Sequence, residues 1–131
     1  MTVGALLDAL AKLDPDTSFT ITDSVMPYLD GDWYSYRGYY DELALQYSNV
    51  DKGFNTVGAL RRILQAALGG TLYGYKGGEY TVTKWTRVWI ATWGAADGRT
   101  VGRPIELHGQ WYLPVAEHDG DGDWWEEDPN A

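Results

Sequence analysis

The sequence predicts an α+β fold in which two short helices pack on one face of a largely antiparallel β-sheet. Two segments, 3–13 and 57–68, carry apolar residues at the three- and four-residue spacing of an amphipathic helix. Short runs rich in β-branched and aromatic residues follow each of them, bounded by turn formers. This order of helix, strands, helix and strands is typical of the α+β class.

Both helices are predicted from an internal repeat. The sequence Thr-Val-Gly-Ala-Leu at 2–6 recurs at 56–60, and each copy places a threonine where its hydroxyl can cap the first turn. Asp14-Pro15 stops the first helix and Gly69-Gly70 stops the second. The residues downstream of the two copies differ, so the repeat indicates one capped-helix design used twice.

The strands are predicted from composition. In chain order the candidates are 19–22, 33–40 (strand or extended loop, with a bend at Arg37-Gly38), 43–47, 72–75, 80–84, 88–93, 101, 105–107 and 111–113. The last two form a closing hairpin with His108-Gly109-Gln110 near its turn. Two helices leave part of the other sheet face open, and a second subunit covering that face would account for the many Trp and Tyr residues.

Length and composition fit a single domain of 131 residues without cysteine, which excludes disulfides, a thiolate zinc site and a cysteine nucleophile. No apolar run reaches the length of a membrane span, and the amino terminus lacks a signal-peptide layout. We expect residues 1–116 to form one ligand-binding domain. We expect residues 117–131 to form a flexible acidic tail that contains two tryptophans.

The charge is concentrated in that tail. The formal net charge is −9, and residues 116–131 contribute seven acidic side chains and no basic one. The nearly neutral body argues against general nucleic-acid binding, because counterion release needs a basic surface. Its ten Lys and Arg residues can still hold a small anion in a local pocket.

Signatures of catalysis are absent from the sequence, which has no Gly-rich phosphate loop and no nucleophile elbow. The two histidines, His108 and His118, lie near a turn and in the tail, where solvated histidines are more common than metal ligands. The run 119–123 resembles the start of a calcium loop, but Trp124 and Asn130 stand where glycine and glutamate are required. We therefore expect no enzyme, no metal and no cofactor.

Two segments combine a cation with glycine and tyrosines: Tyr-Arg-Gly-Tyr-Tyr-Asp at 36–41 and Gly-Tyr-Lys-Gly-Gly-Glu-Tyr at 74–80. A guanidinium binds phosphate through two hydrogen bonds, an aromatic ring stacks on a base, and glycine lets a ligand approach the backbone. Together the segments predict a nucleotide cradle. The alternative, that the tyrosines are core, the glycines turns and the cations surface, stays open.

Arginines near the later strands form a third group. Arg99 and Arg103 flank a short Thr-Val-Gly segment near Trp93 and could reach across a subunit boundary, whereas Arg87 suits a solvated loop equally well. For Arg99 and Arg103 the alternative is also a solvated loop that balances nearby carboxylates. The candidate ligand-binding residues are Arg37, Tyr39, Lys76, Tyr80, Trp93, Arg99 and Arg103.

These motifs, with the opening 2–6 and the strand 88–91, resemble a family of small phage-encoded proteins over about residues 2–105. In size and layout the chain is similar to anti-Thoeris sponge proteins. Those proteins sequester cyclic ADP-ribose signals made by bacterial TIR defence proteins, and relatives hold cyclic oligonucleotides. The resemblance implies an oligomer that binds without cleaving, through aromatic and arginine residues at subunit interfaces. Thr92 stands where related phage sequences often have asparagine, and the tail is outside the pattern.

The leading hypothesis is therefore a phage immune-evasion protein that sequesters a small cyclic nucleotide in the cytoplasm of an infected bacterium. Its expected partners are a small anionic nucleotide and further copies of the chain, as a dimer or a larger homo-oligomer. No membrane and no general nucleic-acid binding is expected. The alternative is an acidic inhibitor that binds a host defence protein directly. A nucleotide-cleaving enzyme is disfavoured by the missing base and metal ligands.

Overall fold

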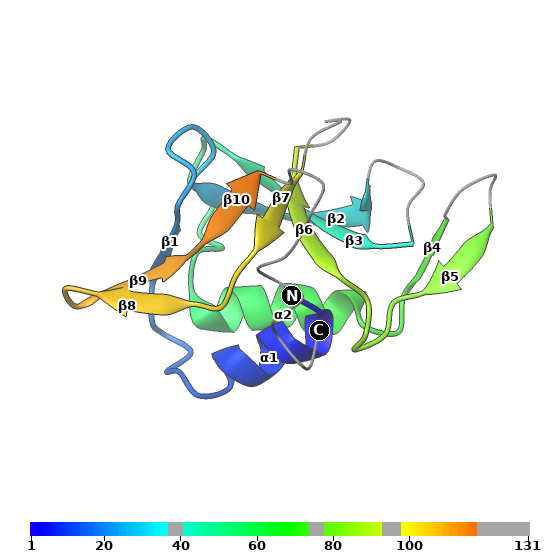
Figure 1. The fold of residues 1–131 in the computed structure, drawn as a ribbon, viewed down its shortest axis with the longest axis horizontal. Helices are drawn as coiled ribbons and strands as arrows, with labels where there is room; N and C mark the ends of the chain where they lie inside the picture. Colours follow the sequence, from blue (N-terminus) through cyan, green and yellow to red (C-terminus); the bar gives the residue numbers. More distant parts are fainter. Residues whose placement is uncertain (37–40, 74–77, 93–97, 118–131) are drawn as a thin grey trace.

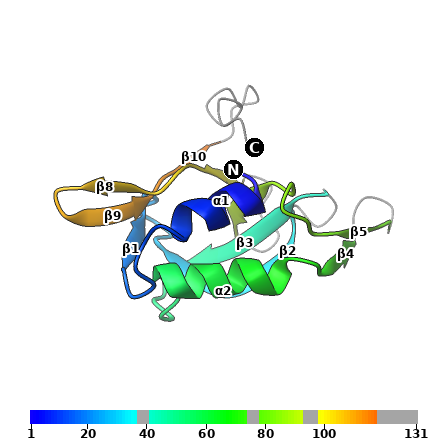
Figure 2. The same ribbon diagram turned by 90° about the horizontal axis from the view of Figure 1, so that it is seen from below.

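Two helices cover one side of the strands (Figures 1 and 2). The computed structural model describes residues 1–36, 41–73, 78–92 and 98–117. The helices are α1 (Val3–Leu10) and α2 (Val57–Ala67). The described strands are β1 (Phe19–Ile21), β2 (Tyr28–Ser35), β3 (Leu43–Ser48), β4 (Thr71–Tyr73), β5 (Glu79–Thr81), β6 (Val88–Ala91), β7 (Arg99–Val101), β8 (Ile105–Leu107), β9 (Gln110–Leu113) and β10 (Val115–Glu117). This architecture confirms the predicted α+β class.

The two threonines of the internal repeat cap the helices. The Thr2 hydroxyl accepts a hydrogen bond from the Ala5 N–H at 3.1 Å, and the Thr56 hydroxyl accepts one from the Ala59 N–H at 3.2 Å. Each bond satisfies a donor that the first turn of a helix leaves without an intrahelical partner. After α2 the chain turns at Gly69, whose φ of 84° favours glycine. Within the described ranges, no helix combines the length and the apolar character needed to span a membrane.

The described strands form three sheets and not the single sheet that the sequence suggested. The largest has the order β10-β7-β6-β3-β2, a second has the order β1-β9-β8, and β4 pairs with β5. Most pairings in the described chain are antiparallel, but β3 pairs with β6 and β1 with β9 in parallel. The strands β2 and β10 differ most from expectation. β2 begins at Tyr28, and β10 carries the sheet to Glu117, which lies opposite Arg99.

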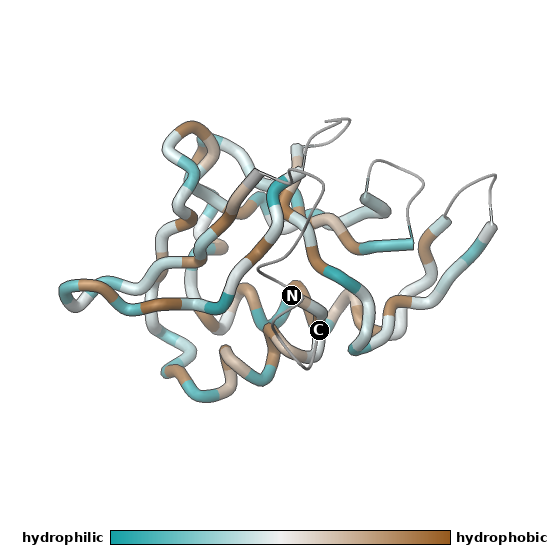
Figure 3. Tube along the Cα trace, viewed as in Figure 1, coloured by the Kyte–Doolittle hydropathy of each residue, from teal (hydrophilic) through white to brown (hydrophobic). Residues whose placement is uncertain are grey.

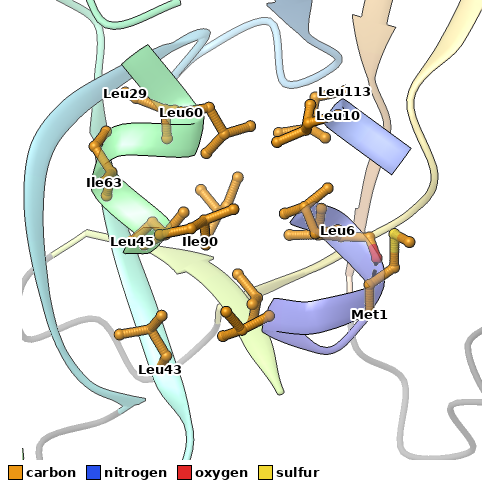
Figure 4. Close-up of a cluster of buried hydrophobic side chains, with 14 of the residues drawn as sticks. Met1, Leu6, Leu10, Leu29, Leu43, Leu45, Leu60, Ile63, Ile90 and Leu113 are labelled. Atoms are coloured by element: carbon orange, nitrogen blue, oxygen red, sulfur yellow. Dashed lines mark hydrogen bonds between the residues drawn. The ribbon is translucent and has the colours of Figure 1, made fainter. Parts of the chain in front are cut away.

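The main core lies between the helices and the largest sheet. Leucines of both helices point toward Leu43 and Leu45 of β3 and toward Ile90 of β6 (Figure 4). Figure 3 shows hydrophobic residues on both helices and on the strands that pack against them. This layer fixes the positions of β2, β3 and β6, the strands that support the candidate site.

The opposite face of the same sheet carries a second buried cluster. It consists of Tyr34, Tyr36, Ala44, Trp89 and Ala91. Tyr36 is 2% exposed and Trp89 is 5% exposed within a single chain. These rings therefore do not provide the open aromatic surface that we expected a second subunit to cover.

Candidate functional site

Two hairpins meet at one end of the molecule. The β2–β3 hairpin contains the motif 36–41, and the β4–β5 hairpin contains the motif 74–80; Figure 1 shows them next to each other. The Ser35 hydroxyl donates a hydrogen bond to the Tyr73 carbonyl oxygen at 2.8 Å, and the Tyr80 hydroxyl donates one to the Glu42 carbonyl oxygen at 2.8 Å. We call this set of four residues, Ser35, Glu42, Tyr73 and Tyr80, the hairpin junction.

The hairpin junction ties the two predicted motifs together. Residues 37–40 and 74–77 lie outside the described residues, so the side chains of Arg37, Tyr39 and Lys76 are not placed. Of the described residues that flank these segments, Tyr36 and Asp41 adjoin the junction in sequence and Tyr73 belongs to it. Chain order alone could not show this, because the motifs are separated by α2.

Tyr80 lies at the junction with its ring partly buried. The ring packs against the main core, and the hydroxyl lies 3.3 Å from the Ser35 hydroxyl in addition to its bond with Glu42. Burial raises the pKa of Tyr80, and the charges of Asp41 and Glu42 raise it further. The phenol therefore stays protonated at neutral pH and acts as a hydrogen-bond donor.

Glu42 connects the junction to β6. Its Oε1 accepts a hydrogen bond from the Trp89 indole Nε1 at 3.1 Å, and its Oε2 lies 4.0 Å from Arg87 Nη1. Arg87 offsets part of this negative charge, but Asp41 adds another exposed carboxylate. The described charged side chains at the junction therefore carry a net negative charge.

The aromatic cluster supports the junction from the sheet. The Tyr36 and Trp89 rings are stacked, with centroids 4.2 Å apart and planes 2° from parallel. The strand β3 lies between them, and the small side chain of Ala44 leaves room for the rings to cross it. The Tyr36 hydroxyl accepts a hydrogen bond from the Gly98 N–H at 3.0 Å. Tyr36 thus links the end of one motif to the residue that follows the segment 93–97.

Tyr34 belongs to the same aromatic cluster and lies in β2, two residues before Tyr36. Its hydroxyl donates a hydrogen bond to the Ala91 carbonyl oxygen at 3.0 Å. Burial, assisted by the neighbouring Tyr36, raises the pKa of Tyr34 to about 12. This phenol remains a neutral donor over the whole physiological range.

The structure does not bring the described members of the seven predicted site residues together in one place. Arg37, Tyr39, Lys76 and Trp93 lie outside the described residues, and Tyr80 is at the junction. Arg99 lies in β7 on the side of the main core, where its Nε is 3.6 Å from the Asp23 carboxylate. Arg103 is exposed in the connection between β7 and β8.

Sequence reasoning missed Ser35 and Glu42. Both are common surface residue types, and neither stands out without knowledge of its partner. The period of two along β2 is the signal that could have found the aromatic cluster, since Tyr34 and Tyr36 share one face. No group of three or more His, Cys, Asp or Glu residues that could hold a metal ion occurs in the described part of the chain.

Comparison with known proteins identifies no relative of this chain. No family model, no curated protein and no solved structure matches the chain.

Proposed function

We propose that the protein binds a small cyclic nucleotide and sequesters it without cleaving it. The ligand class is a cyclic ADP-ribose type signal or a cyclic oligonucleotide, and the setting is immune evasion by a phage in the cytoplasm of an infected bacterium. The observation that carries the proposal is the hairpin junction, which joins the two motifs that combine a cation, glycine and tyrosines.

In this proposal the motif cations bind phosphate and the tyrosines stack on bases. Arg37 and Lys76 supply charge-assisted hydrogen bonds, and Tyr39 and Tyr80 supply aromatic surface. The protein forms a homo-oligomer, in which Trp93 and Arg103 contribute to a pocket from another copy. Arg99, also expected there from the sequence, instead lies beside Asp23 of its own chain. The proposal assigns no catalytic residue and no cofactor, so the ligand leaves the site chemically unchanged.

A release assay tests this function. The purified protein is incubated with a panel of cyclic nucleotides, the free ligand is measured, and the protein is then denatured by heat. Depletion followed by release of the intact ligand supports sequestration. Release of a cleaved product supports an enzyme instead. Absence of depletion across the panel favours the alternative of an acidic inhibitor that binds a host defence protein.

Calorimetric titration with the captured ligand then locates the site. A buried charge-assisted hydrogen bond is worth roughly 1.5–3 kcal/mol, so Arg37→Ala and Lys76→Ala are expected to weaken binding by about ten- to a hundredfold. Arg62→Ala is the matched control, because Arg62 is exposed on α2. Unchanged binding by both motif variants would remove the hairpin junction from the site.

Tyr80 allows positioning to be separated from stacking. Tyr80→Phe keeps the ring but removes the hydrogen bond to Glu42, whereas Tyr80→Ala removes both. Stacking is worth roughly 1–3 kcal/mol per base. We expect Tyr80→Ala to lose more affinity than Tyr80→Phe. Equal losses would show that the ring does not stack on the ligand and that the hydroxyl acts by holding the hairpins together. His108→Ala is expected to be neutral.

A further inference from the structure

A hollow of about 190 Å³ lies beside the first turns of α1. One wall comes from the helix and its cap, and the other comes from the turn that precedes β6. The lining residues are Thr2, Gly4, Ala5, Asp8, Lys84 and Trp85. None of them belongs to the hairpin junction, so the hollow is a separate feature of the surface.

Trp85 stands at the rim of this hollow and is 63% exposed. Its turn is held firmly, because the Trp85 N–H donates to the Thr83 hydroxyl at 3.2 Å and the Thr83 N–H donates to the Thr86 hydroxyl at 2.9 Å. The turn is also fixed to α1 through the Gly4 N–H and the Lys84 carbonyl oxygen at 2.9 Å. An exposed indole on such an ordered turn loses little conformational entropy when a partner covers it.

Gly4 explains how the turn approaches the helix so closely. A Cβ atom at this position would lie 2.9 Å from Lys84 Cβ and 3.1 Å from the Lys84 carbonyl oxygen. Because Gly4 has no side chain, the helix and the turn can approach each other closely enough to form the two walls of the hollow.

The helix end in this hollow is not an anion site. The Val3 N–H donates to the Thr86 carbonyl oxygen, and the Gly4 and Ala5 N–H groups also have protein acceptors. With these donors engaged, no free N–H group of the first turn faces a phosphate or carboxylate. A different kind of occupant is required.

Opposite charges line the hollow. Asp8 and Lys84 are both exposed, and within the described residues neither takes part in an ion pair. The Lys84 ammonium lies 5.1 Å from the centroid of the Trp85 ring. We call the hollow and its rim the Trp85 patch. It thus contains the projecting indole of Trp85, the hollow itself, the positive charge of Lys84 and the negative charge of Asp8. A surface of this composition is complementary to itself.

We propose that this patch forms an isologous interface between two copies of the chain. The indole of Trp85 enters the hollow of the other copy, and Asp8 pairs with the partner subunit's Lys84, while the two-fold axis repeats both contacts. The proposal gives the self-association expected under the proposed function a defined surface. It rests on the proposed function in this respect, and its contacts are tested by the oligomeric state and not by ligand capture.

Sedimentation velocity of the full chain tests the interface. The unmodified protein is expected to associate reversibly to a dimer at micromolar concentrations, and Trp85→Ala is expected to weaken the dimer at least about tenfold, as for a hot-spot tryptophan. A monomer at several hundred micromolar, or an unchanged dimer of Trp85→Ala, overturns the proposal. Circular dichroism confirms that each variant is folded.

Charge variants provide the sharper test. Asp8→Lys and Lys84→Asp each place like charges on both sides of the interface, so each variant alone is expected to be monomeric. In an equimolar mixture the two variants carry opposite charges and are expected to form a heterodimer. Arg62→Asp on α2 is the control and leaves the dimer intact. If the mixture stays monomeric, or if the single variants still dimerise, the assigned contacts are wrong.

The same variants separate this proposal from the proposed function. Nucleotide capture is measured on Asp8→Lys in parallel with its oligomeric state. Dimerisation of the unmodified protein without capture counts against the proposed function alone. Capture by a protein that is monomeric at every concentration counts against the interface and against a pocket shared between copies, and leaves capture at the hairpin junction standing.

Discussion

Asp23 shows how much a single carboxylate organises in this fold. It accepts hydrogen bonds from the Val25 and Met26 N–H groups at 2.8 and 3.2 Å and from the Tyr47 hydroxyl at 2.9 Å, and Arg99 lies 3.6 Å away. Burial alone would raise the pKa of Asp23. The hydrogen bonds and the Arg99 charge outweigh it, so this pKa lies below its ordinary value.

A pH dependence of stability follows from this lowered pKa. An aspartate whose pKa is lower in the folded than in the unfolded state stabilises the protein at pH values above its unfolded-state pKa of about 3.9. The contribution is lost as the pH falls toward the folded pKa. Asp23→Asn is therefore expected to be less stable at pH 7 and to lose less of its remaining stability between pH 5 and pH 3.

Urea unfolding at pH 7, 5 and 3 measures this difference between Asp23→Asn and the unmodified protein. Asp30 also has a lowered pKa, chiefly through its hydrogen bond with Lys52, so some acid sensitivity remains in the variant. If the free energies of unfolding of the two proteins fall by the same amount between pH 7 and pH 3, Asp23 makes no pH-dependent contribution to stability.

The repeated threonines give a comparison between equivalent positions. Thr56→Ala removes the cap of α2 and is expected to lower the free energy of unfolding by about 1 kcal/mol, whereas Thr56→Ser keeps the hydroxyl and most of the stability. Thr2 is 2% exposed, so Thr2→Ala also leaves a small void and is expected to cost more. Equal losses for Thr56→Ser and Thr56→Ala, measured by urea unfolding, would contradict the capping role.

At the level of the elements, the aromatic layer on β2, β3 and β6 depends on a close backbone approach. A Cβ atom at Gly98 would overlap the edge of the Tyr36 ring, whose hydroxyl accepts a hydrogen bond from the Gly98 N–H. Gly98→Ala is expected to separate the Tyr36–Trp89 stack and to destabilise the fold by roughly 1–3 kcal/mol. Near-ultraviolet circular dichroism and urea unfolding measure the two effects.

A double-mutant cycle assigns the cost of Gly98→Ala to this contact. In a Tyr36→Ala background the added methyl group has no ring to displace, so Gly98→Ala is expected to cost much less there. An equal cost in both backgrounds would place the strain elsewhere in the backbone.

The sequence predicted the starts of both helices and the closing hairpin well because their signals are local, whereas α1 ends at Leu10 and not at the Asp14-Pro15 stop. Threonine caps, helical spacing and the His108-Gly109 turn, with φ of 53° and 79°, need no distant partner. The start of β2 was missed because Asp30-Gly31-Asp32 has turn composition, and here the chain instead forms an irregularity within the strand. Parallel pairing, and the contact of the two hairpins, depend on residues far apart in the chain and have no local signal.

At the scale of the whole molecule, the described core is complete before the tail begins. Its fully buried members run from Val3 to Leu113, and β10 ends at Glu117. Deletion of residues 118–131 is expected to change the free energy of unfolding by no more than roughly 0.5 kcal/mol. A much lower urea midpoint would show that Trp124 and Trp125 pack on the fold. A stable truncated protein that loses activity in infected cells would favour the inhibitor alternative.

The parallel pairing of β1 with β9 has a consequence for biosynthesis. Thr22 bonds to Val115, which is 93 positions later, and the Met1 amino group donates to the Val101 carbonyl oxygen, which is 100 positions later. A ribosome adds roughly 5–20 residues per second, so β1 waits on the order of 5–20 s for its partner strand. The nascent chain presents an unpaired strand and apolar helix faces throughout that interval. The sheet of β1, β9 and β8 therefore forms only after nearly the whole chain has emerged, at the slow rate typical of long-range strand pairing.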